Sequence, residues 1–284
     1  MRKEIDLSKF EELEKRENLT IYKYSNKERQ SNHNFVYQYF YDEFNTSDYD
    51  NAYVILFLGK VGDGKSTAIN ALFNIIKGIK LEDNYRLILI KNSGCNEINE
   101  GVHLYYLKDY NNKPVIIINC QGYGCKKGIK YDDMLNDALK YVFSNIINHI
   151  NTICFISSSH NRRLDISTRY IFSQTTNFFT ENICENFIIL STFANGDAML
   201  NGPEFIDTIK YEENFINIQK NGMDEKWWFA FDSKSVLDNE IDKLTKYSFS
   251  QLNEFYEEKV KKMKPKSIKN VLKFLKQEIK LMFK

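Results

Sequence analysis

The sequence of 284 residues predicts an α/β fold in which a mostly parallel central sheet lies between two layers of helices. Three observations support this prediction. Apolar runs of strand length alternate with segments of helical periodicity, which requires crossover connections between parallel strands. The runs VIIIN, ICFI and FIIL are apolar almost throughout, as expected of strands buried on both faces. A glycine-rich segment also separates one apolar run from a helical pattern.

The glycine-rich segment, GKVGDGKST, fits the pattern G-x-x-x-x-G-K-[ST] of a phosphate-binding P-loop. Its glycines let backbone N–H groups curl around phosphates, and the helix that follows adds the positive end of its dipole. We expect Lys65 to reach the β- and γ-phosphates and Ser66 to bind Mg²⁺. The alternative is a glycine-rich turn that binds nothing. The residues expected to contact the nucleotide here are Gly59, Val61, Gly62, Asp63, Gly64, Lys65, Ser66 and Thr67.

The predicted elements follow one another from this loop outward. The expected strands are residues 53–58, 86–90, 102–107, 115–119, 152–156, 187–192 and 228–231. The expected helices lie near residues 66–76, 131–147, 165–179 and 203–218. The sequence therefore predicts a three-layer P-loop domain over residues 49–238. Residues 1–48 form an N-terminal extension, partly helical over residues 3–16, with a polar loop after it. Residues 239–284 form a C-terminal helical tail.

The tail contains two amphipathic patterns, over residues 243–262 and 267–283. In the second, apolar residues follow the i, i+3, i+4, i+7 rule and lysines cover much of the remaining surface. Such a basic helix can lie on an anionic membrane or in the groove of a partner. Alternatively, its apolar stripe packs on the domain while the lysines face water. We favour packing, because such stripes usually belong to a core.

The composition is that of a folded globular protein, with 43% hydrophobic and 14% aromatic residues. The formal net charge of +1 indicates neither a nucleic-acid nor a membrane partner. Five cysteines without a C-x-x-C pair indicate a reducing compartment. The first residues lack the apolar centre of a signal peptide, and no apolar stretch approaches the length of a membrane span. We therefore expect a cytoplasmic location, with membrane association through the basic helix as an addition.

A second nucleotide motif is expected where the strand at residues 115–119 ends. GTPases carry D-x-x-G there, and its Asp holds Mg²⁺ through water. This chain has Asn119 at the carboxylate position and Gly122 at the position that senses the γ-phosphate. A neutral amide can accept a hydrogen bond from a metal-bound water, but it supplies no charge to offset Mg²⁺. We therefore expect weakened metal affinity.

The base-recognition motif is expected after the strand at residues 187–192, where GTPases carry [NT]-K-x-D. Thr192 fits the first position, and Phe193 replaces the Lys with a ring that can cover the base. Asn195 replaces the Asp, and an amide offers one acceptor oxygen where a carboxylate offers two, so guanine discrimination should weaken. Asp197 can substitute if the loop bends. The last base-contacting loop is expected at residues 232–235, around Ser233.

The first switch offers little for catalysis. The sequence has no Thr between Thr67 and Thr152, and Ser93, the one hydroxyl of this kind in the relevant loop, reads more simply as a loop serine. Phosphoryl transfer depends on positioning and charge neutralisation. Loss of both the metal-linked Asp and the switch Thr predicts slow hydrolysis.

These stretches together resemble the septin-like and GIMAP-like (immunity-associated, avirulence-induced-gene type) GTPases of the septin/dynamin-like group. GKVGDGKSTAINALF resembles GKST-x-I-N-A-L, and CQGYGCKKGIKYDDMLND resembles D-T-x-G-x-G-D-x-R-G-x-x-x-D. The stretch ICFISSSHNRRLDISTRYIFS, followed by NFIILSTFANGD, resembles a strand, an R-L pair and a long helix that lead to T-F-A-D-G. The similarity covers about residues 53–237. The departures are Asn119, Asn195 and Cys125, each in place of Asp.

The resemblance implies GTP or GDP binding with Mg²⁺ and nucleotide-dependent self-association through the G-domain face, with membrane or filament roles in many members. Arg162 or Arg163 could act in trans as an arginine finger, although a surface or packing role is the simpler interpretation. Three functions stay open at this point. They are a slow Mg²⁺-dependent GTPase, a catalytically dead pseudo-GTPase scaffold, and a P-loop ATPase or nucleotide kinase. The third ranks last, because no Asp ends a strand at the metal and no basic lid segment follows the domain.

Overall fold

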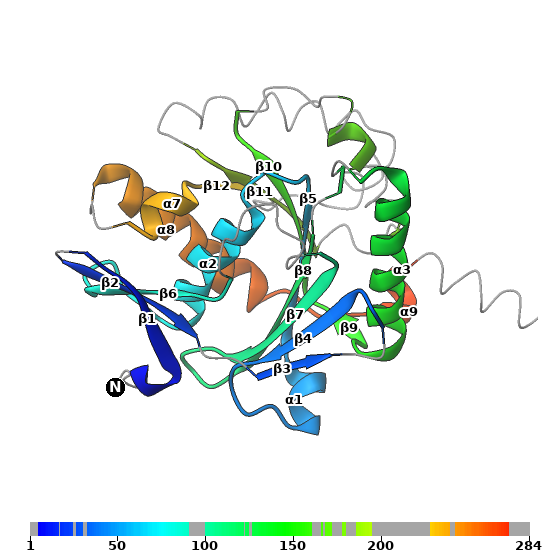
Figure 1. Cartoon of the computed structure of the whole chain (residues 1–284), viewed down its shortest axis with the longest axis horizontal. Coiled ribbons are helices and arrows are strands. Elements are labelled where there is room, and N and C mark those ends of the chain that lie inside the picture. The colour runs from blue at the N-terminus through cyan, green and yellow to red at the C-terminus, as the bar shows by residue number, and fades with distance from the viewer. Residues whose placement is uncertain are drawn as a thin grey trace, which may run out of the picture.

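A computed structural model confirms the α/β fold with a large, mostly parallel central sheet (Figure 1). It describes residues 5–16, 18–24, 27–30, 33–90, 100–121, 123–124, 127–160, 166, 168–171, 178–179, 186–194, 228–238 and 242–272. The eight strands of the sheet have the order β12-β11-β10-β5-β8-β7-β4-β3. Their bounds are β3 (Lys27–Gln30), β4 (Val36–Phe40), β5 (Tyr53–Gly59), β7 (Val102–Lys108), β8 (Pro114–Cys120), β10 (Thr152–Ser158), β11 (Phe187–Thr192) and β12 (Trp228–Ala230). Only the pairs β7–β8 and β3–β4 are antiparallel.

Helices cover both faces of this sheet, as three layers require (Figure 1). One face carries α2 (Lys65–Ile76), α7 (Ser233–Val236) and α8 (Lys243–Glu254), which continues as the π-helix η5 (Phe255–Val260). The other face carries α3 (Ile129–Asn145) and α9 (Ile268–Val271). Strand β5 serves both cores, because its side chains alternate in direction. Val54, Leu56 and Leu58 pack toward α3, while Ile55 and Phe57 pack toward α2.

The N-terminal extension is built from strands, so the helix expected over residues 3–16 is wrong. After the short 3₁₀ turn η1 (Leu7–Lys9), β1 (Phe10–Arg16) pairs antiparallel with β2 (Leu19–Tyr24). Most β1 side chains are exposed, so no apolar helical face exists to be buried. Phe10 instead packs its ring against Tyr24, with centroids 4.3 Å apart.

The polar loop expected at residues 26–34 (NKERQSNHN) is also partly wrong. Residues 27–30 form β3, which pairs antiparallel with β4, and β4 pairs parallel with β7. The β4 sequence VYQYF offers aromatic side chains at alternate positions, which suits a strand. Strands β3 and β4 thus extend the central sheet with residues from the predicted N-terminal extension. The short helix α1 (Thr46–Asn51) then leads into β5.

The strand expected at residues 86–90 forms, as β6 (Tyr85–Ile88), but in a separate three-stranded sheet of order β1-β2-β6. Two buried amides on α2 bind this strand and the residues after it. The Asn74 side chain accepts from the backbone N–H of Leu87 (2.8 Å) and donates to its carbonyl (2.9 Å). The Asn70 side chain accepts from the N–H groups of Leu89 (2.9 Å) and Ile90 (2.8 Å). Side-chain amides of α2 therefore supply backbone hydrogen bonds to β6 and the residues after it, as a neighbouring strand would.

The helices expected at residues 66–76, 131–147 and 243–262 are confirmed by α2, α3 and the run from α8 into η5. Those at residues 165–179 and 203–218 fall largely or wholly outside the described residues. Of the helix expected at residues 267–283, only the first turn is described, as α9. Its Ile268, together with Leu272, is buried in the α3-side core. A short antiparallel pair, β9 (His149–Ile150) and β13 (Lys266–Ser267), fixes this turn. No helix among the described residues has the length and apolarity to span a membrane.

Candidate nucleotide-binding site

The P-loop between β5 and α2 has a backbone that requires glycine at three positions. Gly59, Gly62 and Gly64 have φ values of +145°, +93° and +82°, which side chains with a Cβ rarely adopt. A Cβ on Gly59 would overlap the carbonyl oxygen of Ile156 in β10, and a Cβ on Gly64 would lie 3.2 Å from the ring of Phe193. The loop is therefore a tightly packed, preformed turn around the N-terminus of α2.

Lys65 begins α2 and turns its ammonium group back into the loop. The side chain is buried, and Nζ donates to the carbonyl oxygens of Gly59 (3.1 Å) and Lys60 (2.8 Å). Burial lowers the pKa of Lys65 to about 8, while the charge of Asp63 opposes that shift. Burial removes most of the water that would solvate the Lys65 ammonium group, and two backbone carbonyls replace only part of it. An anion that enters the loop would compensate this loss, so Lys65 is suited to bind one.

Asn119 ends β8 beside the P-loop strand, where its register partners are Phe57 of β5 and His103 of β7. Its side chain is only 8% exposed, and Oδ1 has no hydrogen-bond partner among the described residues. The Asn119 side chain also hydrogen-bonds the buried hydroxyl of Tyr105, whose pKa burial raises well above the usual value. An unsatisfied buried amide oxygen is energetically costly, so this acceptor is available for a hydrogen bond from a ligand or a water molecule.

The oxygen chemistry at this point fits a hard divalent cation. The hydroxyl of half-buried Ser66 would be a direct Mg²⁺ ligand, and the Asn119 oxygen would accept a hydrogen bond from a metal-bound water. The donor set lacks a carboxylate on β8. In the part of the chain that the structure describes, no cluster of three or more His, Cys, Asp or Glu side chains could hold a metal by itself.

The stretch after β8 is tied to the P-loop by Tyr123, which the sequence analysis did not single out. Tyr123 donates its backbone N–H to the carbonyl of Gly59 and accepts from the N–H of Val61, both at 3.3 Å, and so forms a β-bridge with Lys60. Its ring is buried, and its hydroxyl donates to Oδ1 of Asn136 on α3 (2.8 Å). The only sequence signal for this role is its place directly after Gly122.

Two further contacts join this stretch to the first turns of α3. The Tyr131 hydroxyl donates to Oε1 of Gln121 (2.6 Å), and the N–H of Gly124 donates to Oδ1 of Asp132 (3.2 Å). Burial raises the pKa of Asp132, although the Gly124 N–H opposes the shift. The segment that would face a γ-phosphate is therefore connected to α3 at several points.

The base-recognition strand β11 contacts the opposite side of the P-loop. Thr192 donates from Oγ1 to the carbonyl of Asp63 (2.6 Å), so the two motifs are physically joined. Phe193 follows in the left-handed region, with φ +55°, and Ser159 holds its carbonyl through a 2.8 Å hydrogen bond from Oγ. The Phe193 ring packs on Gly64 yet is 40% exposed. One part of an aromatic side chain thus stays open to solvent beside the phosphate loop.

The loop at residues 232–235 begins α7, with Asp232 as its N-cap. Ser233 is buried there, and its Oγ has no hydrogen-bond partner within the described ranges. The end of α7 is anchored by Arg86 of β6, which donates from Nε to the carbonyl of Val236 (2.9 Å). Arg86 is fully buried, and its remaining donors bind backbone carbonyls of Lys80, Leu81, Asp83 and Tyr85. Burial lowers the pKa of this guanidinium against the attraction of nearby acidic groups.

Most predicted site residues are brought together in this way. The P-loop residues, Asn119, Thr192, Phe193 and Ser233 all lie at the carboxyl ends of β5, β8 and β11 and the start of α7, where ligands of parallel sheets bind. Gly122, Asn195, Asp197 and Arg163 lie outside the described residues, as do Arg162, Ser93 and Cys125. Their roles stay predictions.

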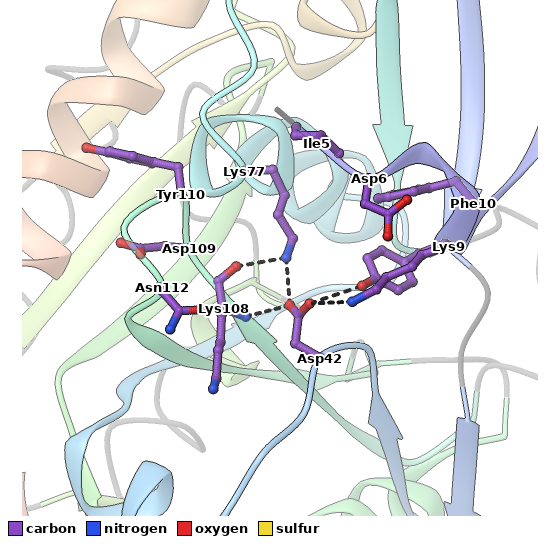
Figure 2. Close-up of a pocket in the computed structure, with 11 residues that line it drawn as sticks. Ile5, Asp6, Lys9, Phe10, Asp42, Lys77, Lys108, Asp109, Tyr110 and Asn112 are labelled. Carbon is purple, nitrogen blue, oxygen red and sulfur yellow. Dashed lines mark hydrogen bonds and ion pairs between the residues drawn. The ribbon is translucent and has the colours of Figure 1, made fainter. Parts of the chain in front are cut away.

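A separate pocket of about 170 Å³ lies at the other end of α2, where Lys77 faces Asp42 and the residues around Lys9 and Phe10 (Figure 2). At its centre, Lys77 donates to Asp42 Oδ2 (2.7 Å) and to the carbonyl of Lys108 (2.8 Å). Asp42 also accepts from the backbone N–H of Lys108 and the hydroxyl of Tyr24. These polar groups satisfy one another's hydrogen-bonding capacity. We therefore interpret the pocket as part of the packing between the two sheets and not as a ligand site.

Comparison with solved structures shows that Toc33 from Arabidopsis thaliana shares this fold. Toc33 from Arabidopsis thaliana with Mg²⁺ and GMPPNP matches with a TM-score of 0.52 and 13% identity, over 76% of this chain and 87% of that chain. Toc33 with GDP and Mg²⁺ matches with a TM-score of 0.50 and the same identity and coverage. A structure from work on dimerization and GTPase activity of the chloroplast translocon components atToc33 and psToc159 matches at 0.51, with 14% identity over 77% and 86% of the two chains.

No protein-family model matches this sequence. No curated protein matches it either. At identities of 13–14%, the structural similarity shows a shared G-domain fold and does not assign a subgroup within it. The septin-like or GIMAP-like affiliation therefore stays a prediction.

Proposed function

We propose that this chain binds GTP and GDP with Mg²⁺ at the P-loop and hydrolyses GTP slowly. The observation that carries the proposal is the preformed loop itself, in which three glycines with positive φ surround a buried, partly desolvated Lys65. Strained glycine conformations and a desolvated cation are both unfavourable by themselves, and an anion bound in the loop would offset their cost. The nucleotide complexes of Toc33, which share the fold, support the same assignment.

In this proposal each residue has one task. Lys65 exchanges its carbonyl partners for phosphate oxygens, and the N–H groups at the start of α2 bind the same phosphates. Phe193 offers its exposed ring surface to the base, since base–aromatic stacking does not depend on which purine is present. Mg²⁺, when bound near Ser66, neutralises charge on the phosphates. Asn119 orients a metal-bound water without adding a negative charge, so hydrolysis is slow.

A catalytically dead scaffold is the second candidate, favoured by the same neutral Asn119. The two differ in one measurement, the release of inorganic phosphate from GTP with Mg²⁺. Turnover on the order of 10⁻³ per second or below, comparable to an unassisted GTPase, supports the slow enzyme. Release no faster than in the absence of protein supports the scaffold.

Self-association through the face that carries the nucleotide forms part of this proposal. A fold relative was studied for the importance of dimerization to GTPase activity, which supports it. Analytical ultracentrifugation with GDP, with a GTP analogue and without nucleotide tests it, and a mass that does not change among the three contradicts it. The cytoplasmic location and a membrane-bound C-terminal helix also stay proposals. The burial of Ile268 favours packing of that helix on the domain.

The nucleotide assignment is tested by denaturing the purified protein and identifying any released nucleotide by chromatography. Calorimetry with GTP, GDP and ATP in Mg²⁺ then gives the affinities. Lys65→Gln is expected to abolish binding, because a neutral amide cannot replace the ammonium charge. Lys77→Gln is the matched control, since Lys77 is a partly buried lysine (side chain 11% exposed) at the opposite end of α2, with Asp42 as its own ion-pair partner.

Unchanged binding in Lys65→Gln would show that the P-loop is not the site. Equal affinity for ATP and GTP would withdraw the guanine preference while leaving the phosphate site intact. Failure of all three nucleotides to bind the unaltered protein would end the proposal.

A further inference from the structure

We propose that Tyr123 is a latch that makes this site selective for nucleoside diphosphates over triphosphates. The inference rests on the proposed function and concerns the regulation of the same site. A β-bridge joins Lys60 of the P-loop to Tyr123 of the stretch after β8.

The bridge closes the space that a third phosphate needs. Backbones paired in this way lie only about 4.8 Å apart, which leaves no room for a phosphate group between them. In the proposed binding mode, the inner phosphates lie at the start of α2, and the terminal phosphate would extend to the segment of the P-loop that Tyr123 pairs with, at Gly59 and Val61. A diphosphate ends before this point. A triphosphate must separate Tyr123 from the loop.

The bridge itself is weak, and the side chain of Tyr123 holds it in place. Both backbone hydrogen bonds are 3.3 Å long, at the far end of the normal range. The Tyr123 hydroxyl, in contrast, makes a 2.8 Å bond to Asn136 on α3, and its ring is buried. Opening the bridge therefore pulls on α3, and the strength of the Tyr123–Asn136 bond sets part of the cost.

The placement of Tyr123 also accounts for slow turnover. GTPases of this fold class that hydrolyse efficiently place a water-orienting side chain close to the terminal phosphate. Tyr123 lies in that region of the chain, but its side chain is directed into the α3-side core and its hydroxyl is engaged by Asn136. The latch and the low catalytic capacity are two results of one side-chain position.

Calorimetry with GDP and with a non-hydrolysable GTP analogue, each with Mg²⁺, tests the latch. The unaltered protein should bind GDP more tightly by on the order of tenfold, because the analogue must break two backbone hydrogen bonds. Tyr123→Phe removes the anchor but keeps the ring. It should strengthen analogue binding by roughly fivefold, the worth of one neutral hydrogen bond, and leave GDP affinity unchanged.

Asn136→Ala removes the acceptor of the same hydrogen bond. Asn136 is half-buried on α3, and its substitution should strengthen analogue binding by the same factor. The double variant should add little, because both substitutions remove one interaction. Tyr256→Phe is the matched control. It removes a tyrosine hydroxyl that donates to Asp109 Oδ2 at 3.1 Å, far along the chain from the site, and should leave the ratio of the two affinities unchanged.

Equal or tighter binding of the analogue by the unaltered protein would overturn the latch while leaving the nucleotide site intact. So would an unchanged affinity ratio in folded Tyr123→Phe and Asn136→Ala. Absence of binding by both nucleotides would instead overturn the proposed function, and the latch with it.

Discussion

The depressed pKa of Lys65 predicts that nucleotide binding takes up protons in mildly alkaline solution. In the nucleotide-free protein, burial lowers this pKa from 10.5 to about 8. Phosphate oxygens placed against the ammonium group stabilise its charged form and raise the pKa again. Over the range between the two values, binding and protonation are therefore linked.

The magnitude follows from the fraction of neutral Lys65 in the free protein. At pH 8, about half of the molecules have a neutral amine, so binding takes up about 0.5 proton per nucleotide. The uptake falls to about 0.1 at pH 7 and rises to about 0.9 at pH 9. Above pH 8 the affinity should fall by up to roughly tenfold per pH unit, since each binding event must acquire a proton.

The same pKa shift makes the stability of the nucleotide-free protein increase with pH, whereas the nucleotide affinity decreases with pH. Because the folded pKa is below the unfolded one, the unfolded state binds more protons between pH 8 and 10.5. The contribution of Lys65 to the free energy of unfolding of the nucleotide-free protein therefore increases as pH rises through this window, by roughly 3 kcal/mol in total. Below pH 8 this contribution is lost.

Calorimetry in buffers with different ionisation enthalpies measures the uptake directly. The terminal phosphate is fully ionised at pH 8 and above, so its own titration does not interfere. The control is Lys77→Gln, which removes a different, partly buried lysine and should keep the full uptake. An uptake that is the same at pH 7 and pH 9, with binding intact, would refute the reasoning.

Four further outcomes are expected. Gly59→Ala should lower the free energy of unfolding by about 2–4 kcal/mol in urea, because its methyl group overlaps a β10 carbonyl, whereas Gly62→Ala, with open space around it, should cost about 1 kcal/mol. Asn74→Ala should cost about 2–3 kcal/mol in the same assay, since it leaves buried backbone groups of β6 without a partner. Asn119→Asp should tighten Mg²⁺ binding on the order of tenfold in a metal titration and speed phosphate release. Phe193→Ala should weaken GTP and ATP binding alike by about 1–3 kcal/mol, and loss of only one would contradict stacking.

The parts of the molecule that local spacing determines could be predicted from the sequence. The P-loop motif needs a strand, three glycine conformations and a helix in immediate succession, and all of these lie within residues 53–76. Buried parallel strands are apolar throughout, so β5, β8, β10 and β11 were recognisable one at a time.

Features that depend on distant residues could not be predicted. β1 has too few apolar side chains to show its period, and only pairing with β2 makes it a strand. Asn74 and Arg86 look like ordinary polar residues in the sequence, because the backbone groups that they bind are identified only by the fold. The role of Tyr123 could not be predicted either, because it depends on the bridge to Lys60 and on the hydrogen bond to Asn136.

The pairing of the first strands has a consequence during protein synthesis. Strand β2 pairs with β6, and β4 pairs with β7, so residues 19–40 are synthesised before their partner strands at residues 85–108. Until then these hairpins expose unpaired strand edges, a state that favours aggregation over folding. Expression yield should therefore depend on the speed of translation through residues 40–108. A fragment that begins at residue 49 would expose the β7 edge permanently, because β4 covers it.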